Sequence, residues 1–129
     1  MPQTKIYGNA EFIQQNRELL SNTIHSCVVD AFNYPPEKKF QRFFPLLAED
    51  FEYPSDRSDK YIIIEILMFS GRSVEAKKTL HRLLFDRLKV NLDINPLDVE
   101  VILIETPSHN WGIRGMSGDE LNLSYKVNV

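Results

Sequence analysis

Proline is the second residue of the chain, within the opening stretch MPQTKIY. A proline nitrogen inside a chain is a tertiary amide, which carries no proton and has no useful basicity. Removal of Met1 would instead leave Pro2 as a free secondary amine. Desolvation in an apolar pocket lowers the pKa of such an amine toward neutrality, where it can take a proton from one atom and return it to another. Pro2 is therefore a candidate general base.

Arg72 is the second candidate, and its position suits it to hold an anion. It lies between the apolar run YIIIEILMF and the first turn of a predicted helix, where free backbone N–H groups and the helix dipole favour negative charge. A guanidinium can bind a carboxylate through two parallel hydrogen bonds and polarise an adjacent carbonyl. The alternatives are a solvent-exposed loop arginine or an ion pair with Glu65 or Glu75.

The remaining side chains that could do chemistry form no recognisable constellation. His25 and His81 fall on predicted helices and are expected at the surface, whereas Cys27 lies on a predicted buried stripe. No cluster of cysteine and histidine has the spacing of a zinc site. We therefore expect neither a metal nor a cofactor.

Composition limits the classes of protein that the chain can belong to. Its 129 residues, 43% hydrophobic and 26% charged, indicate one globular domain. The net charge of −3 gives no reason to expect a nucleic-acid partner. The single cysteine, the lack of an apolar run of about 20 residues and the absence of a signal-peptide pattern predict a cytoplasmic protein that does not enter a membrane.

Two helices and four strands must position the candidates. Apolar residues at three- and four-residue steps predict a helix from Ala10 to Phe32, which a pair of prolines ends. Ser73 is a good N-cap for a second helix running to about Val90. Strands are expected before the first helix and in the segments KKFQRFFPLLA, YIIIEILMF and VEVILIE.

The two halves of the chain look like copies of one βαβ unit. Sliding the sequence by 60 positions aligns apolar residues of the helices and the proline breaks that follow, Pro36 and Pro96. We expect an α/β (α+β) fold in which two tandem units form a four-stranded sheet with both helices on one face. The units would span about 2–48 and about 60–106, followed by a loop and a strand over 107–129.

Such a sheet has one uncovered face, although its strands are too apolar to face water. No third helix is predicted, so another subunit is expected to cover that face. The tail LNLSYKVNV alternates apolar and polar residues, as an edge strand does, and could pair with a neighbouring chain.

Taken together, these segments resemble the tautomerase superfamily (4-oxalocrotonate tautomerase-like). The resemblance is carried by the initial Met-Pro, the duplicated unit, and the segments PPEKKFQ, GRSVEAKK and ETPSHNW. It is nearest to the longer members, the group that includes malonate semialdehyde decarboxylase. The resemblance implies a homotrimer around a central axis, although the partner chains could also differ from this one.

The resemblance also implies roles for individual residues. Pro2 matches the catalytic N-terminal proline, and Arg72 matches the arginine that binds the substrate carboxylate. Trp111 matches an aromatic residue that walls the pocket, although it could equally pack its loop onto the core. Arg114 is a candidate for a second anion contact.

Two positions depart from the decarboxylase-like members. Lys38 stands where those members carry an aspartate, and Ser70 stands where they carry the first of two arginines. We place Lys38 among the substrate-binding candidates. Proton transfer needs neither of the missing groups, so the predicted activity is a cofactor-independent isomerase reaction, enol–keto tautomerisation of a small 2-oxo or 2-hydroxy-dienoic acid. The alternatives are a non-catalytic, carboxylate-binding trimer and a decarboxylase- or hydratase-like relative.

Overall fold

The computed structural model describes residues 2–129 and contains the two expected helices and four main strands. In chain order these are β1 (Gln3–Asn9), α1 (Ala10–Phe32), β2 (Gln41–Leu46), β3 (Ile62–Phe69), α2 (Val74–Leu92) and β4 (Val99–Thr106). The predicted limits of α1 are confirmed. Helix α2 begins after its Ser73 cap, whose hydroxyl accepts a hydrogen bond from the amide of Ala76, and ends two residues beyond Val90.

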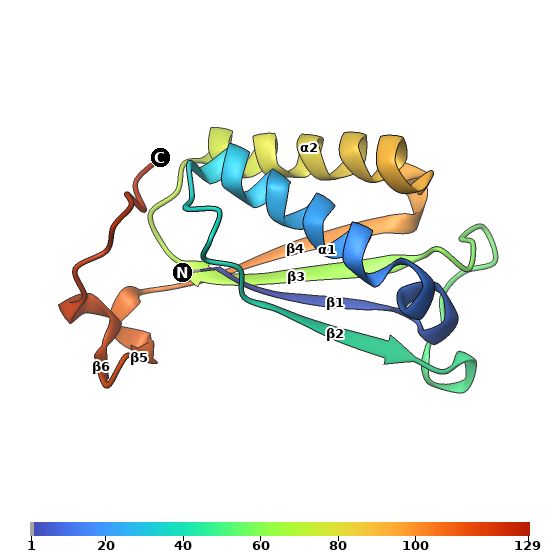
Figure 1. Cartoon of the computed structure of the whole chain (residues 1–129), viewed down its shortest axis with the longest axis horizontal. Helices are drawn as coiled ribbons and strands as arrows, with labels where there is room; N and C mark the ends of the chain where they lie inside the picture. The colour runs from blue at the N-terminus through green and yellow to red at the C-terminus, as the bar shows by residue number, and fades with distance from the viewer. Residues whose placement is uncertain (1) are drawn as a thin grey trace.

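The four strands form one sheet in the order β2-β1-β3-β4. Strands are parallel within each βαβ unit and antiparallel where β1 meets β3. Figure 1 shows both helices on one face of this sheet, as the sequence predicts. Pro45 lies in β2, an edge strand, where a residue without an N–H donor is tolerated.

Both helices end in the same way, 60 residues apart. Asn33 after α1 has φ 50°, and Asp93 after α2 has φ 54°. Each residue is thus in the left-handed conformation that ends a helix, which asparagine and aspartate tolerate better than most residues. The 60-residue correspondence between the two halves therefore includes the backbone conformation at the helix ends.

Alternation along the strands divides the sheet into a buried and an open face. Ile62, Ile64 and Ile66 point toward the helices and are fully buried. On the opposite face of the single chain, Ile102 is 50% exposed and Ile104 is 37% exposed. The expected uncovered apolar face is therefore present.

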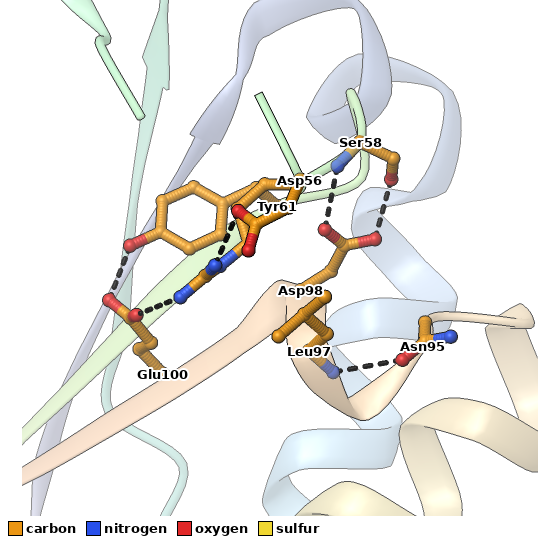
Figure 2. A network of polar contacts seen from close by, with 8 residues as sticks. Asp56, Ser58, Tyr61, Asn95, Leu97, Asp98 and Glu100 are labelled. Carbon is orange, nitrogen blue, oxygen red and sulfur yellow. Dashed lines mark hydrogen bonds and ion pairs between the residues drawn. The ribbon is translucent and has the colours of Figure 1, made fainter. Parts of the chain in front are cut away.

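A polar network fastens the long loop before β3 to the start of β4. Figure 2 shows the Asp98 carboxylate accepting hydrogen bonds from the amide and the hydroxyl of Ser58, at 2.8 and 2.5 Å. Beside it, Glu100 accepts hydrogen bonds from the Tyr61 hydroxyl and from Arg57. Because β1 and β3 are antiparallel, this network lies at the end of the sheet away from Pro2.

Replacing Asp98 by alanine should lower the free energy of unfolding by about 1–3 kcal/mol, because the amide and the hydroxyl of Ser58 would lose the buried carboxylate that accepts from both. Urea denaturation measures the effect. Asp56→Ala is the matched control, since Asp56 is 62% exposed and only forms a surface ion pair, which is worth about 1 kcal/mol or less. Equal losses in the two variants would contradict the structural role of Asp98.

The C-terminal tail is not a strand within the single chain. Residues 121–129, all within the described chain, form no strand, and pairing with a neighbouring chain remains a prediction. Their side chains do alternate between half-buried and exposed, but the inward ones pack on this same chain, where Tyr125 and Val129 contact the core. In the single chain the alternation therefore matches packing against the chain's own core. Before the tail, β5 (Gly112–Ile113) and β6 (Met116–Ser117) form a small hairpin.

Within residues 2–129 no helix combines the length and the apolar character that crossing a membrane requires.

Candidate active site

The sheet brings the candidate residues to one of its ends. Gln3 lies opposite Leu67, so β1 begins where β3 ends. The segment before β2 reaches the same end, because the amide of Thr4 donates a hydrogen bond of 3.0 Å to the carbonyl of Phe40. β4 runs parallel to β3 and also ends there. Figure 1 shows the start of β1, the hairpin and the tail gathered at this end.

Pro2 is buried at the start of β1. Side chains alternate along a strand, so Pro2 shares its face with Thr4 and Ile6, which point toward the helices. Met1 lies outside the described residues, and its removal remains a prediction.

Arg72 is also buried, with only 4% of its surface exposed. Its guanidinium carbon lies 4.6 Å from the centre of the Phe32 ring, and its Nη1 donates a long hydrogen bond of 3.5 Å to the carbonyl of Phe69. Burial lowers the pKa of the guanidinium, because removal from water disfavours the charge. Neither alternative for Arg72 is correct: it is not solvent-exposed, and among the described residues no carboxylate pairs with it.

Trp111 is anchored beside the end of β3. Its indole N–H donates to the Thr106 hydroxyl at 2.7 Å, and its ring meets Phe69 edge to face at 5.2 Å. The ring therefore packs its loop onto the core at this end of the sheet. Arg114 lies in the turn of the β5–β6 hairpin with φ 55°, and its side chain is exposed.

Lys38 contacts the tail. Its ammonium group donates a hydrogen bond of 3.0 Å to the Ser124 hydroxyl and lies 5.2 Å from the centre of the Tyr125 ring. The residue that replaces the expected aspartate therefore secures the C-terminal segment in the described chain.

Sequence reasoning missed two residues beside Arg72, namely Tyr34 and Tyr125. Their rings meet edge to face at 4.8 Å, and Tyr34 is only 3% exposed. The motif FNYPP, in which Tyr34 follows the end of a helix, was the available signal for the first of them. No local pattern places Tyr125 there, because the tail reaches Arg72 only through the tertiary fold.

The charges at this end of the sheet favour an anion. Lys38, Arg72 and Arg114 are cationic, and the nearby Glu105 already forms an ion pair with Lys77. A carboxylate has the charge and the acceptor atoms that this group of donors requires. Among residues 2–129 no cluster of histidine, cysteine and acidic side chains is arranged to hold a metal ion.

Two surface cavities of the single chain lie away from Arg72. A cavity of about 610 Å³ is at the opposite end of the sheet, where Asn9, Tyr53 and Lys60 contribute to its wall. A smaller one of about 280 Å³ lies beside the start of β1 and includes Gln3 and Phe40. Arg72 lines neither cavity and is itself buried.

Comparison with known proteins identifies relatives over most of the chain. A family model described as "Tautomerase enzyme" matches residues 38–114. The probable tautomerase YusQ of Bacillus subtilis (strain 168) is 28% identical over 97 residues, which cover 71% of this chain and 76% of that protein. The probable tautomerase YrdN of the same organism is 25% identical over 103 residues, covering 76% and 79%.

Solved structures share the fold. A crystal structure of malonate semialdehyde decarboxylase superposes with a TM-score of 0.77 at 22% identity, covering 86% of this chain and 89% of that one. A fused 4-OT asymmetric trimer superposes with a TM-score of 0.80 at 17% identity, covering 91% and 96%.

Proposed function

Because the chain belongs to the tautomerase enzyme family, we propose that it catalyses enol–keto proton transfer on a small 2-oxo or 2-hydroxy-dienoic acid. Pro2, freed by the removal of Met1, is the general base. Arg72 holds the substrate carboxylate, and Trp111 helps to exclude water. The reaction needs no cofactor, because the proton leaves and returns through one amine.

The observation that carries this proposal is the buried Arg72 at the end of the sheet where Pro2 begins β1. A buried guanidinium without a carboxylate partner is costly, and a bound substrate carboxylate would supply that partner. The negative charge that develops on the oxygen when the enol or keto form loses its proton would be stabilised by the same cation. Pro2 is buried on the helix side of the sheet, which is the side where Arg72 contacts Phe32.

Decarboxylation or hydration is the second candidate function. It is favoured by the structural similarity to malonate semialdehyde decarboxylase, whose structure is described in terms of decarboxylase and hydratase activities. Against it, Lys38 is a cation that contacts the tail, and a lysine cannot accept a proton from water as a carboxylate does. A non-catalytic, carboxylate-binding protein would retain Arg72 and lack turnover.

We further propose that the protein is a homotrimer. The half-exposed Ile102 and Ile104 lie on the sheet face that the helices leave open, and a subunit interface would bury them. Several structures with this fold are described as trimers.

Covalent labelling tests the base directly. Pt0534, a protein whose solved structure shares this fold, is inactivated by 2-oxo-3-pentynoate. This reagent is an electrophile that an amine can attack. We expect intact-mass measurement to show a chain without Met1, and one equivalent of this reagent to add to the Pro2 nitrogen with loss of phenylenolpyruvate tautomerisation. Peptide mapping locates the adduct. Retention of Met1, or inactivation with the adduct on another residue, would refute the role of Pro2.

A further inference from the structure

A group of buried polar atoms around Arg72 has no hydrogen-bond partner within residues 2–129. The group consists of Nε and Nη2 of Arg72 and the hydroxyl oxygens of Tyr34 and Tyr125. A buried polar group that makes no hydrogen bond destabilises the fold, and a charged group does so more strongly. Four such atoms in one place therefore lower the stability of the fold, unless a group from outside the single chain forms hydrogen bonds with them.

An acceptor is the one kind of partner that would serve all four atoms. The guanidinium nitrogens only donate, and burial raises the pKa of both phenols above its usual range, so the two hydroxyls stay protonated and can donate. The Phe32 ring closes one side of the guanidinium. A carboxylate fits this arrangement, since its two oxygens offer about four acceptor sites and its charge neutralises Arg72.

Access to Arg72 is blocked by the tail that carries Tyr125. Figure 1 shows residues 121–129, at the red end of the colour scale, running from the hairpin to the start of α2. The tail is held by the hydrogen bond from Lys38 to Ser124 and by the Ser73 hydroxyl, which donates to the main-chain oxygen of Val129 at 2.9 Å.

Few contacts of this kind hold the tail in place. Both hydrogen bonds are exposed, and residues 121–129 belong to no helix or strand. Segments fixed by few exposed hydrogen bonds open at low free-energy cost. To open, the tail must break these two bonds and the packing of Tyr125 and Val129 on the core, but no backbone pairing of the sheet.

We propose that Tyr34 and Tyr125 complete the Arg72 site as hydrogen-bond donors to the substrate carboxylate, and that residues 121–129 form a cover that opens to admit it. The inference rests on the proposed binding of a small carboxylic acid. It adds two ligand-contacting residues and a moving segment to that function. Lys38 then acts as the residue that holds the closed cover.

Calorimetric titration with 3-phenylpropanoate tests the two tyrosines, because this probe carries a carboxylate but no enol. Tyr34→Phe and Tyr125→Phe should each raise Kd about tenfold, the loss of one hydrogen bond to a charged group. Tyr61→Phe is the matched control, since its hydroxyl contacts Glu100 at the other end of the sheet (Figure 2), and its Kd should not change. Circular dichroism checks the fold of each variant. An unchanged Kd in the Tyr34 and Tyr125 variants would overturn their role.

Amide hydrogen exchange tests the cover. In the free protein, residues 121–129 should exchange quickly through local opening, and saturation with 3-phenylpropanoate should slow that exchange, because Tyr125 then binds the carboxylate. The same slowing should be lost in Tyr125→Phe. Exchange of the tail that does not respond to the probe would refute the cover.

These measurements are independent of turnover. Weaker binding in both tyrosine variants of a protein that fails to tautomerise phenylenolpyruvate would support this inference and refute the proposed reaction. The opposite result is turnover of phenylenolpyruvate together with an unchanged Kd for 3-phenylpropanoate in both tyrosine variants. It would support the reaction and refute the inference.

Discussion

Replacing Pro2 by alanine should lower kcat/KM for phenylenolpyruvate by about 100-fold or more, as expected for loss of a general base. Alanine at this position still permits removal of Met1, but it leaves a primary amine on a backbone that lacks the fixed φ of proline. Such an amine is held less firmly at the start of β1, where Pro2 is buried. Steady-state kinetics at neutral pH measure the effect, and intact mass shows whether each variant has lost Met1.

Pro45→Ala is the matched control, because Pro45 is exposed on the edge strand β2. Its kcat/KM should equal that of the wild type. Binding of 3-phenylpropanoate should survive Pro2→Ala, since Arg72 remains. A Pro2→Ala protein that tautomerises phenylenolpyruvate as fast as the wild type would disprove the proline mechanism.

Replacing Arg72 by methionine should make the protein more stable and nearly inactive. Arg72 is 4% exposed, and no carboxylate among the described residues pairs with its guanidinium. An apolar side chain in place of a buried charge removes the desolvation cost, so the free energy of unfolding should rise by about 1 kcal/mol or more. kcat/KM should fall about 100-fold or more, because two charge-assisted hydrogen bonds to the substrate are lost. Urea denaturation and steady-state kinetics measure the two effects.

Lys77→Met provides the contrast. Lys77 is a half-buried cation of the same end of the molecule, but it forms an ion pair with Glu105. Its removal leaves that carboxylate without its partner, so this variant should be less stable than the wild type. If Arg72→Met is destabilised as strongly as Lys77→Met, Arg72 stabilises the fold. Its buried charge would then be no evidence of a role in binding substrate.

Much of the fold could be predicted because its signals are local. The stripe of apolar residues and the prolines that follow set the limits of α1, and Ser73 marked the start of α2. The apolar segments before and after α2 indicated the strands whose helix-facing residues, such as Ile64 and Ile66, are fully buried. Parallel pairing within each unit followed from the βαβ connection.

The environment of the site was harder to predict. Arg72 was named as the residue that holds an anion, but neither its burial nor its neighbours were predicted, and the tail, read as an edge strand, packs on the core in the single chain. Both features arise from one contact, since Tyr125 packs beside Tyr34 and helps to cover Arg72. This contact joins residues about 90 positions apart along the chain, and the alternation of the tail cannot distinguish pairing with a strand from packing on a core.

By itself the sequence determined the helices, the strands and the family resemblance, because periodicity, capping and proline breaks act over a few residues. It also named Pro2 and Arg72 as candidates. Only the tertiary structure decided that Arg72 is buried among Phe32, Tyr34 and Tyr125, with donors that the single chain leaves unsatisfied between residues 2 and 129. Burial depends on which distant segments pack together, and desolvation of that kind governs what a charged side chain can bind.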